Sequence, residues 1–152
     1  MKFNMKMYKY LLVLLLFTVG TLEATSLRDT TYGSVVVSEV TSIYDGDTFR
    51  VNLEGYPALI GSRMGIRVNG IDTPEMRGKC KKEKTLARTA KQFTVAHLRA
   101  AKKIELRNMK RGKYFRIVAD VYVDGKNLGQ MLIDQGFAVV YDGGHKAKDW
   151  CQ

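Results

Sequence analysis

The pattern of apolar and polar positions predicts that the first half of the chain is rich in β-strands. Runs of β-branched and other apolar residues begin at Val35 and recur at residues 48–53 and 66–68, as is typical of strands. Turn-forming residues separate these runs, at Asp45-Gly46 and at residues 54–57. We therefore expect three strands joined by tight turns.

Between residues 81 and 102 the apolar positions change to the period of an amphipathic helix. They follow steps of three and four residues, at Leu86, Ala90, Phe93, His97 and Ala100. We interpret His97 as a packed, hydrogen-bonded histidine rather than a catalytic one. The opposite side of this helix is basic.

The rest of the pattern predicts two more strands, at residues 104–107 and 114–123, and a short helix that begins near Leu128 and is capped by Gly136. Strands, a helix, further strands and a last helix in this order indicate an α+β fold that is mainly β. We expect a five-stranded Greek-key barrel of the oligonucleotide-binding type, with two or three packed helices.

The first 24 residues have the layout of a secretory signal peptide. Lysines at positions 2, 6 and 9 precede an apolar run over residues 10–19, which is shorter than the roughly 20 residues of a membrane-spanning helix. We expect cleavage after Ala24, a linker over residues 25–34 and a domain over residues 35–152. The protein would then be exported, either to a periplasm or out of the cell. In the alternative reading, an uncleaved segment anchors the chain to the membrane.

The charge of the exported part favours polyanions. The full chain has 25 basic and 15 acidic residues, and loss of three lysines and one glutamate with the signal segment leaves a net charge of +8. Such an excess attracts nucleic acid by its field and by counterion release. A solvated basic surface without a dedicated partner is the alternative, and the basic cluster (Arg77, Lys79, Lys81, Lys82 and Lys84) fits either reading.

Two cysteines, Cys80 and Cys151, lie in the exported part. In an oxidising compartment an even pair usually forms one disulfide. That bond would tie the segment after Pro74 to the end of the chain. Zinc is disfavoured, because two isolated cysteines and the remaining histidines lack the ligand spacing of a zinc site.

Two carboxylate clusters carry the chemistry, Asp45-Gly46-Asp47-Thr48 and Asp72-Thr73-Pro74-Glu75. Carboxylate and carbonyl oxygens suit Ca²⁺. Arg67 lies five residues before Asp72, on the strand face opposite Ile66 and Val68, and guanidinium groups suit phosphate. Each motif alone has an ordinary reading, as turn chemistry or as a capped helix start.

Together with Lys113-Tyr114-Phe115-Arg116, these motifs resemble the staphylococcal nuclease (thermonuclease) family over about residues 35–140. The resemblance implies a barrel of the oligonucleotide-binding type and Ca²⁺-dependent hydrolysis of DNA and RNA to 3′-phosphate products. One departure is Phe115, where the family usually has glycine, and we expect it to stiffen the loop.

The resemblance also implies roles for single residues. Asp47 and Asp72 would bind Ca²⁺ through their carboxylates and Thr73 through its carbonyl. Glu75 would act on the attacking water, as a general base or by positioning it. The remaining residues would contact substrate: Arg67 and Arg116 at the scissile phosphate, Lys113 and Tyr114 at a neighbouring phosphate, and Tyr141 by stacking on a base.

A rival prediction is an exported nucleic-acid-binding barrel that no longer cuts. Such a module would be expected to lose the glutamate or an arginine, whereas this chain retains both Glu75 and the pair Arg67 and Arg116. A basic barrel docked on anionic lipid would explain the charge but not the carboxylates. The enzyme reading implies no stable protein partner, and we expect a monomer.

Overall fold

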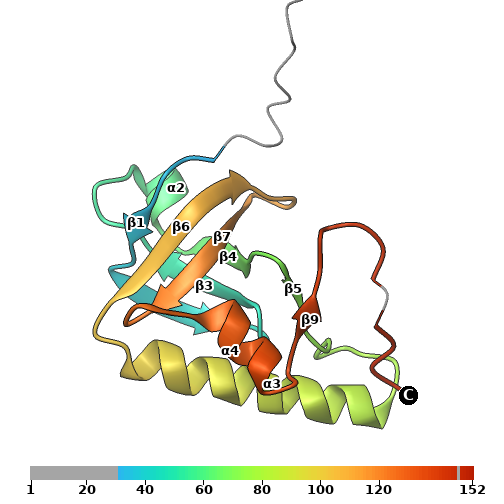
Figure 1. Ribbon diagram of the computed structural model, residues 1–152. Helices are drawn as coiled ribbons and strands as arrows, with labels where there is room; N and C mark the ends of the chain where they lie inside the picture. Colours follow the sequence, from blue (N-terminus) through green and yellow to red (C-terminus); the bar gives the residue numbers. More distant parts are fainter. Residues whose placement is uncertain (1–30, 147) are drawn as a thin grey trace, which may run out of the picture.

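The computed structural model describes residues 31–146 and 148–152, and Figure 1 shows their arrangement. The expected signal peptide and residues 25–30 of the expected linker lie outside the described residues. Within the described part, no helix is both long enough and apolar enough to cross a membrane.

One curled sheet forms most of the molecule, and its strands follow the order β1-β6-β7-β4-β3-β2, with β8 paired to β7. The β4–β7 pair is parallel and the other pairs are antiparallel. The strands are β1 (Val35–Val36), β2 (Glu39–Ile43), β3 (Thr48–Asn52), β4 (Met64–Val68), β6 (Ile104–Arg111), β7 (Arg116–Val123) and β8 (Lys126–Asn127).

The first strand run closes this sheet into a barrel. Its β1 half pairs with β6, whereas its β2 half pairs with β3 at the other edge of the sheet. Only Val37 and Ser38 separate the two halves. Val37 N donates to Ile104 O and Ser38 N donates to Asn52 O, so hydrogen bonds continue across the bend. Counted as continuous runs, five strands form the barrel, and the predicted fold class is confirmed.

The barrel interior follows from alternation along the strands, because successive side chains point to opposite faces. Phe49 and Val51 of β3 and Ile66 and Val68 of β4 are buried, with Arg50 and Arg67 between them on the outer face. Leu106 of β6 is fully buried in the same cluster. Burying an aliphatic or aromatic side chain of this size stabilises the fold by about 1.5–3 kcal/mol, so the alternation also fixes which side each arginine occupies.

Within residues 31–146 and 148–152, three helices accompany the barrel, α2 (Ala58–Gly61), α3 (Lys81–Ala100) and α4 (Leu128–Asp134). The long helix α3 runs across the end of the barrel that is shown at the bottom of Figure 1. Its most buried residues are Ala87, Ala90, Thr94 and Leu98. The predicted stripe is therefore rotated by about one position, and the prediction that Ala100 belongs to it is wrong, because Ala100 is exposed.

The histidine and glycine predictions on these helices are confirmed. His97 Nδ1 lies 2.8 Å from Phe93 O, and the His97 ring packs on the Phe93 ring at a centroid distance of 4.1 Å. Gly136 follows α4 at φ +71°. Gly136 N donates to Ile133 O and Phe137 N donates to Leu132 O, which is the hydrogen-bond pattern of a Schellman cap.

The structure corrects two boundaries. Strand β6 continues to Arg111, and β7 begins only at Arg116. Tyr114 and Phe115 have φ of 57° and 54°, so the prediction that residues 114–115 belong to a strand is wrong. Aromatic residues are typical of strands, so Tyr114 and Phe115 suggested a strand where the backbone forms a left-handed turn.

A second, small sheet was not predicted. Strand β5 (Ile71–Asp72) pairs antiparallel with β9 (Val139–Val140), with Asp72 opposite Val139. Tyr141 N continues the pairing by donating to Gly70 O at 2.9 Å. This sheet holds the C-terminal segment beside the second carboxylate cluster.

Candidate functional site

The turn between β2 and β3 carries the first carboxylates. Asp47 is fully buried, and its Oδ2 accepts hydrogen bonds from Thr73 Oγ1 at 2.9 Å and Thr73 N at 3.3 Å. Its Oδ1 accepts from Thr48 Oγ1 at 2.8 Å. The two sequence clusters, 26 residues apart, therefore meet directly.

Gly46 lets this turn pack against α3. A Cβ at position 46 would lie 3.0 Å from Ala90 Cβ and 3.0 Å from Thr73 Cγ2, which is closer than side-chain carbons ordinarily pack. Thr94 Oγ1 donates to Gly46 O at 2.7 Å and fixes the turn to the helix. The glycine is needed here for close approach rather than for an unusual φ.

Asp45 lies in the same turn and is also buried. Burial raises the pKa of Asp45 to about 7, and the neighbouring charge of Asp47 acts in the same direction. Ionisation of two adjacent buried carboxyl groups is energetically unfavourable, and a bound cation can offset this cost.

Arg67 links the two clusters, as its predicted position on the outer face of β4 allows. Its guanidinium forms an ion pair with Asp47 and donates to Ile71 O at 3.2 Å. Arg67 Nη2 also lies 3.6 Å from Asp72 Oδ1. The Arg67 side chain is 17% exposed, so it is not fully enclosed by the protein.

Glu75 lies in the loop that leads into α3, and Glu83 holds that loop. Glu83 Oε1 accepts from Glu75 N at 3.3 Å, and Glu83 Oε2 accepts from Lys79 N at 2.8 Å. A Cβ at Gly78 would lie within 2.5 Å of the Glu83 carboxyl group. Glu83 was not singled out in the sequence, although a glutamate three residues after the helix N-cap at Cys80 is a known capping pattern.

Lys146 is the residue in contact with the carboxylates that sequence reasoning missed most clearly. Its Nζ lies 2.7 Å from Asp72 Oδ1 and 2.6 Å from Glu75 Oε1. Partial burial acts to lower the pKa of Lys146, but the attraction of its ammonium group to the carboxylates of Asp72 and Glu75 outweighs this effect and raises the pKa. No local pattern marks this lysine, because only the path of the C-terminal segment brings it here.

The end of the chain is held close to the site by the predicted disulfide. Cys80 and Cys151 are bonded, with their Cα atoms 5.9 Å apart. The adjacent Trp150 is buried, and its Nε1 donates to Asp72 Oδ2 at 3.5 Å. The disulfide thus joins the start of α3 to the segment that contacts Asp72.

Arg116 lies on the same outer face as Arg67. In the parallel register, Gly65 is opposite Arg116 and Arg67 is opposite Val118, so the two arginines are two positions apart on adjacent strands. A Cβ at Gly65 would lie 3.0 Å from Arg116 Cγ. Gly65 therefore leaves room for the Arg116 side chain to lie across β4.

The other predicted substrate contacts lie farther out. Lys113 and Tyr114 are exposed in the turn before Arg116, and the Arg116 guanidinium lies 5.6 Å from the Tyr114 ring centroid. Tyr141 borders a different hollow, which Asp72 and Lys146 also line. The structure thus joins Asp47, Asp72, Thr73 and Arg67 directly. Glu75 is connected to Asp72 through Lys146, and the other predicted residues lie around this group.

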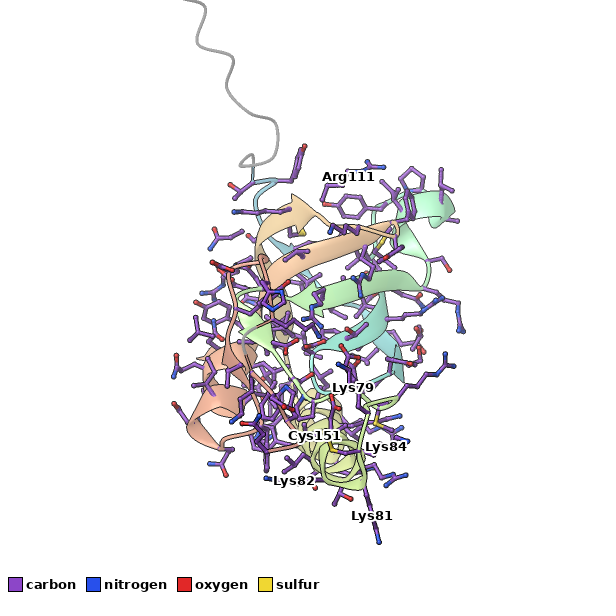
Figure 2. The ribbon with its side chains drawn as sticks, turned by 90° about the vertical axis from the view of Figure 1, so that its right-hand side faces the viewer. Lys79, Lys81, Lys82, Lys84, Arg111 and Cys151 are labelled. Carbon is purple, nitrogen blue, oxygen red and sulfur yellow. A yellow bond between two sulfur atoms is a disulfide. The ribbon has the colours of Figure 1, made fainter. Side chains whose placement is uncertain are left out.

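The exposed lysines of the basic cluster gather around the start of α3. Figure 2 shows Lys79, Lys81, Lys82 and Lys84 beside Cys151, whereas Arg111 lies at the opposite end of the molecule. Basic side chains therefore occur on both sides of the carboxylate site.

The donor set fits a hard divalent cation. Asp47, Asp72 and the Thr73 carbonyl offer only oxygen atoms, which Ca²⁺ prefers. Asp72 Oδ1 is buried and, among the described residues, has no hydrogen-bond donor with suitable geometry, although Lys146 lies within ion-pair distance. A cation bound at this oxygen would have to displace the ammonium group of Lys146.

Comparison with known proteins agrees with this arrangement. The family model described as "Staphylococcal nuclease homologue" matches residues 65–150, a range that includes Arg67, Asp72, Glu75 and Arg116. A relative named "Probable endonuclease LCL3", from Podospora anserina, is 29% identical over 126 residues, which cover 68% of this chain and 45% of the relative. The chain thus spans less than half the length of that protein.

Proposed function

The chain belongs to the staphylococcal nuclease family, and on this premise we propose that it is a Ca²⁺-dependent nuclease that hydrolyses phosphodiester bonds in DNA and RNA to 3′-phosphate products. One observation carries the proposal. Asp47, Asp72 and Glu75 lie in a single network of ion pairs with Arg67 and Lys146. If these carboxylates only stabilised the fold, the network would have no need of Glu75, whose side chain is half-exposed at its edge.

Asp47 and Asp72 would hold Ca²⁺ through their carboxylates and Thr73 through its carbonyl. When bound, the cation would supply Lewis-acid polarisation of the phosphate. Thr73 also orients Asp47 through two hydrogen bonds, so its side chain and backbone act on the same carboxylate. The ion pair between Arg67 and Asp47 would have to open in part, because the Arg67 guanidinium is needed at the phosphate.

Glu75 would orient the attacking water and accept its proton. Its side chain is 48% exposed and contacts Lys146 at 2.6 Å, so water reaches it once this ion pair opens. Glu83 fixes the backbone beneath it. Because its backbone is fixed, Glu75 would stay in position for catalysis when its carboxylate exchanges Lys146 for water.

Arg67 and Arg116 would grip the scissile phosphate from one face of the sheet. The planar guanidinium group matches two phosphate oxygens at once, and two such groups stabilise the added negative charge as phosphorus becomes five-coordinate. Lys113 and Tyr114, in the turn before Arg116, would contact the next phosphate. Tyr141 would stack on a base beside Asp72.

A non-catalytic nucleic-acid-binding barrel is the second candidate, and the basic surface alone supports it. Incubation of purified protein with plasmid DNA, in Ca²⁺ or in excess chelator, separates the two. We expect Ca²⁺-dependent cleavage, with 3′-phosphate ends on the products. DNA that is bound and shifted but stays intact in Ca²⁺ would support the binding module instead.

We also propose that the protein is exported after cleavage of residues 1–24. The positive start and short apolar run of this segment support the proposal, and a disulfide suits an oxidising compartment. N-terminal sequencing of protein from fractionated cells tests it. A mature chain that begins at Thr25 is expected, and intact Met1 on cytoplasmic protein would contradict the proposal.

A further inference from the structure

A second hollow opens at the end of the barrel away from α3. It is bounded by the start of β4, the end of β6, the start of β7 and the helix α2, and has a volume of about 340 Å³. This volume lies at the small end of the range for ligand sites. None of the carboxylates described above lines it.

The hollow is apolar at its floor and aromatic at its rim. Met64 and Met109 are nearly buried at the floor. Tyr32, Tyr56 and Phe115 line the opening and are 59%, 44% and 53% exposed. Apolar rings that remain this exposed around one opening indicate a surface that takes a partner.

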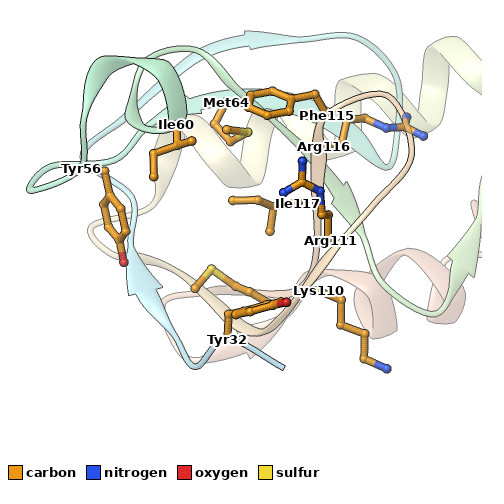
Figure 3. Close-up of a pocket in the computed structure, with 10 residues that line it drawn as sticks. Tyr32, Tyr56, Ile60, Met64, Lys110, Arg111, Phe115, Arg116 and Ile117 are labelled. Carbon is orange, nitrogen blue, oxygen red and sulfur yellow. The ribbon is translucent and has the colours of Figure 1, made fainter. Parts of the chain in front are cut away.

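Basic side chains accompany these rings. Lys110, Arg111 and Arg116 line the same hollow, and Figure 3 shows that the ammonium end of Lys110 extends away from it. The Arg111 guanidinium lies 5.8 Å from the Phe115 ring centroid. Exposed rings with adjacent cations favour a ligand that has a flat apolar part and a negative charge, and a nucleotide has both.

The left-handed turn at Tyr114 and Phe115 separates two arginine–aromatic pairs. Tyr114 pairs with Arg116, whereas Phe115 pairs with Arg111. Backbone conformations of this kind are unfavourable for residues other than glycine, and strained turns are common at ligand sites. The turn keeps Phe115 exposed at the hollow rather than buried in the barrel.

The hollow is also continuous with the outer face of the sheet that carries Arg116. Phe115 and Arg116 line both this hollow and a neighbouring groove over β3 and β4, which Arg50 and Tyr114 also line. A polynucleotide held at Arg116 can therefore continue past Phe115 into the hollow.

We propose that this hollow binds one unpaired base of the substrate strand, next to the phosphate held by Arg116. The base stacks on Phe115 and Tyr56, and its phosphate lies beside Arg111. This inference rests on the proposed function only in taking the ligand to be a nucleic acid.

The test uses fluorescence anisotropy of a labelled single-stranded oligonucleotide with the full chain in excess chelator, so that binding is measured without cleavage. Tyr56→Ala should weaken binding by roughly tenfold, because stacking on one ring typically contributes that much. Arg111→Gln should weaken binding and reduce the slope of log affinity against log salt by about 1. Val36→Ala, an exposed apolar position on β1 away from the hollow, is the matched control.

A scan with single abasic sites gives a readout that a structural role would not change. The parent protein should lose affinity when the abasic site falls at one position of the strand, and Tyr56→Ala should lose this position dependence. A flat scan for the parent, or parental affinity for both variants, would overturn the inference. Cleavage in Ca²⁺ is measured separately, so a protein that binds in this way but never cuts would contradict the proposed function alone.

Discussion

At the scale of single residues, Arg67 has the most demanding position. It neutralises Asp47 and lies 3.6 Å from Asp72, yet the proposed reaction needs its planar guanidinium at the phosphate. Lysine keeps the charge but cannot contact two oxygens in one plane. We expect Arg67→Lys to lower the single-turnover cleavage rate by roughly 10²–10³-fold, as loss of one transition-state donor does, while duplex binding in Ca²⁺ is largely retained.

Quench-flow measurement with a labelled duplex tests this prediction. Arg88→Lys is the control, since Arg88 is exposed on α3 and should cut at the parental rate. Equal rates for Arg67→Lys and the parent would remove Arg67 from the chemistry.

Lys146 gives a second prediction at this scale. Its ammonium group already contacts Asp72 and Glu75, so an incoming cation must displace it. Lys146→Met should raise Ca²⁺ affinity by roughly threefold to tenfold, the gain expected from losing partly exposed ion pairs that compete with the ion. Isothermal titration calorimetry measures this directly, with the exposed Lys126→Met as control. Unchanged or weaker Ca²⁺ binding in Lys146→Met would show that the lysine does not compete.

At the scale of elements, the loop before α3 depends on one buried carboxylate. Glu83 accepts hydrogen bonds from the backbones of Glu75 and Lys79, and glutamine would keep only one acceptor oxygen. We expect Glu83→Gln to lower the free energy of unfolding by about 1–2 kcal/mol and also to lower turnover. Urea denaturation and cleavage assays measure the two effects, with Glu39→Gln on β2 as control. A loss of stability without any loss of turnover would show that loop position does not matter for the reaction.

The disulfide acts on an element in a different way. Closing a loop between residues 71 positions apart should stabilise the fold by about 4 kcal/mol through the unfolded chain. We expect the double variant Cys80→Ser and Cys151→Ser to lose most of this stability but to change the chemical rate much less, because neither sulfur takes part in hydrolysis. Serine at position 80 can also still cap α3.

Urea denaturation of the parent, with and without reductant, measures the stability contributed by the disulfide. Mass spectrometry of the non-reduced exported protein checks the bond itself. Two free thiols in a folded, active sample would contradict the disulfide.

At the scale of the whole molecule, the sequence was a good guide where one periodic pattern decided the outcome. Alternation along β4 placed Ile66 and Val68 on one face and Arg67 on the other, as the structure has them. The sheet closes into a barrel because the chain bends at Val37 and Ser38, so that β1 pairs with β6 and β2 pairs with β3. At Tyr114 and Phe115, side-chain preference and backbone conformation disagree, and the pattern could not show the turn.

The candidate site was predictable only in part, for a related reason. The carboxylates and arginines occur in short motifs, and the resemblance of these motifs to a known family singled them out as candidates. Lys146 lies 71 positions from Glu75 and reaches it because β9 pairs with β5 and Cys151 bonds to Cys80. Such a contact depends on the path of the whole chain, and no window of sequence contains it.

The central claim is that Glu75 acts on the attacking water at a site built from Asp47, Asp72 and Arg67. Single-turnover cleavage by Glu75→Gln in saturating Ca²⁺ tests it most directly, because glutamine keeps the shape but cannot accept the proton. We expect the rate to fall by about 10²–10⁴-fold, with duplex affinity within a few-fold of the parent. A Glu75→Gln variant that cuts at nearly the parental rate, after contaminating nuclease has been excluded, would contradict the claim.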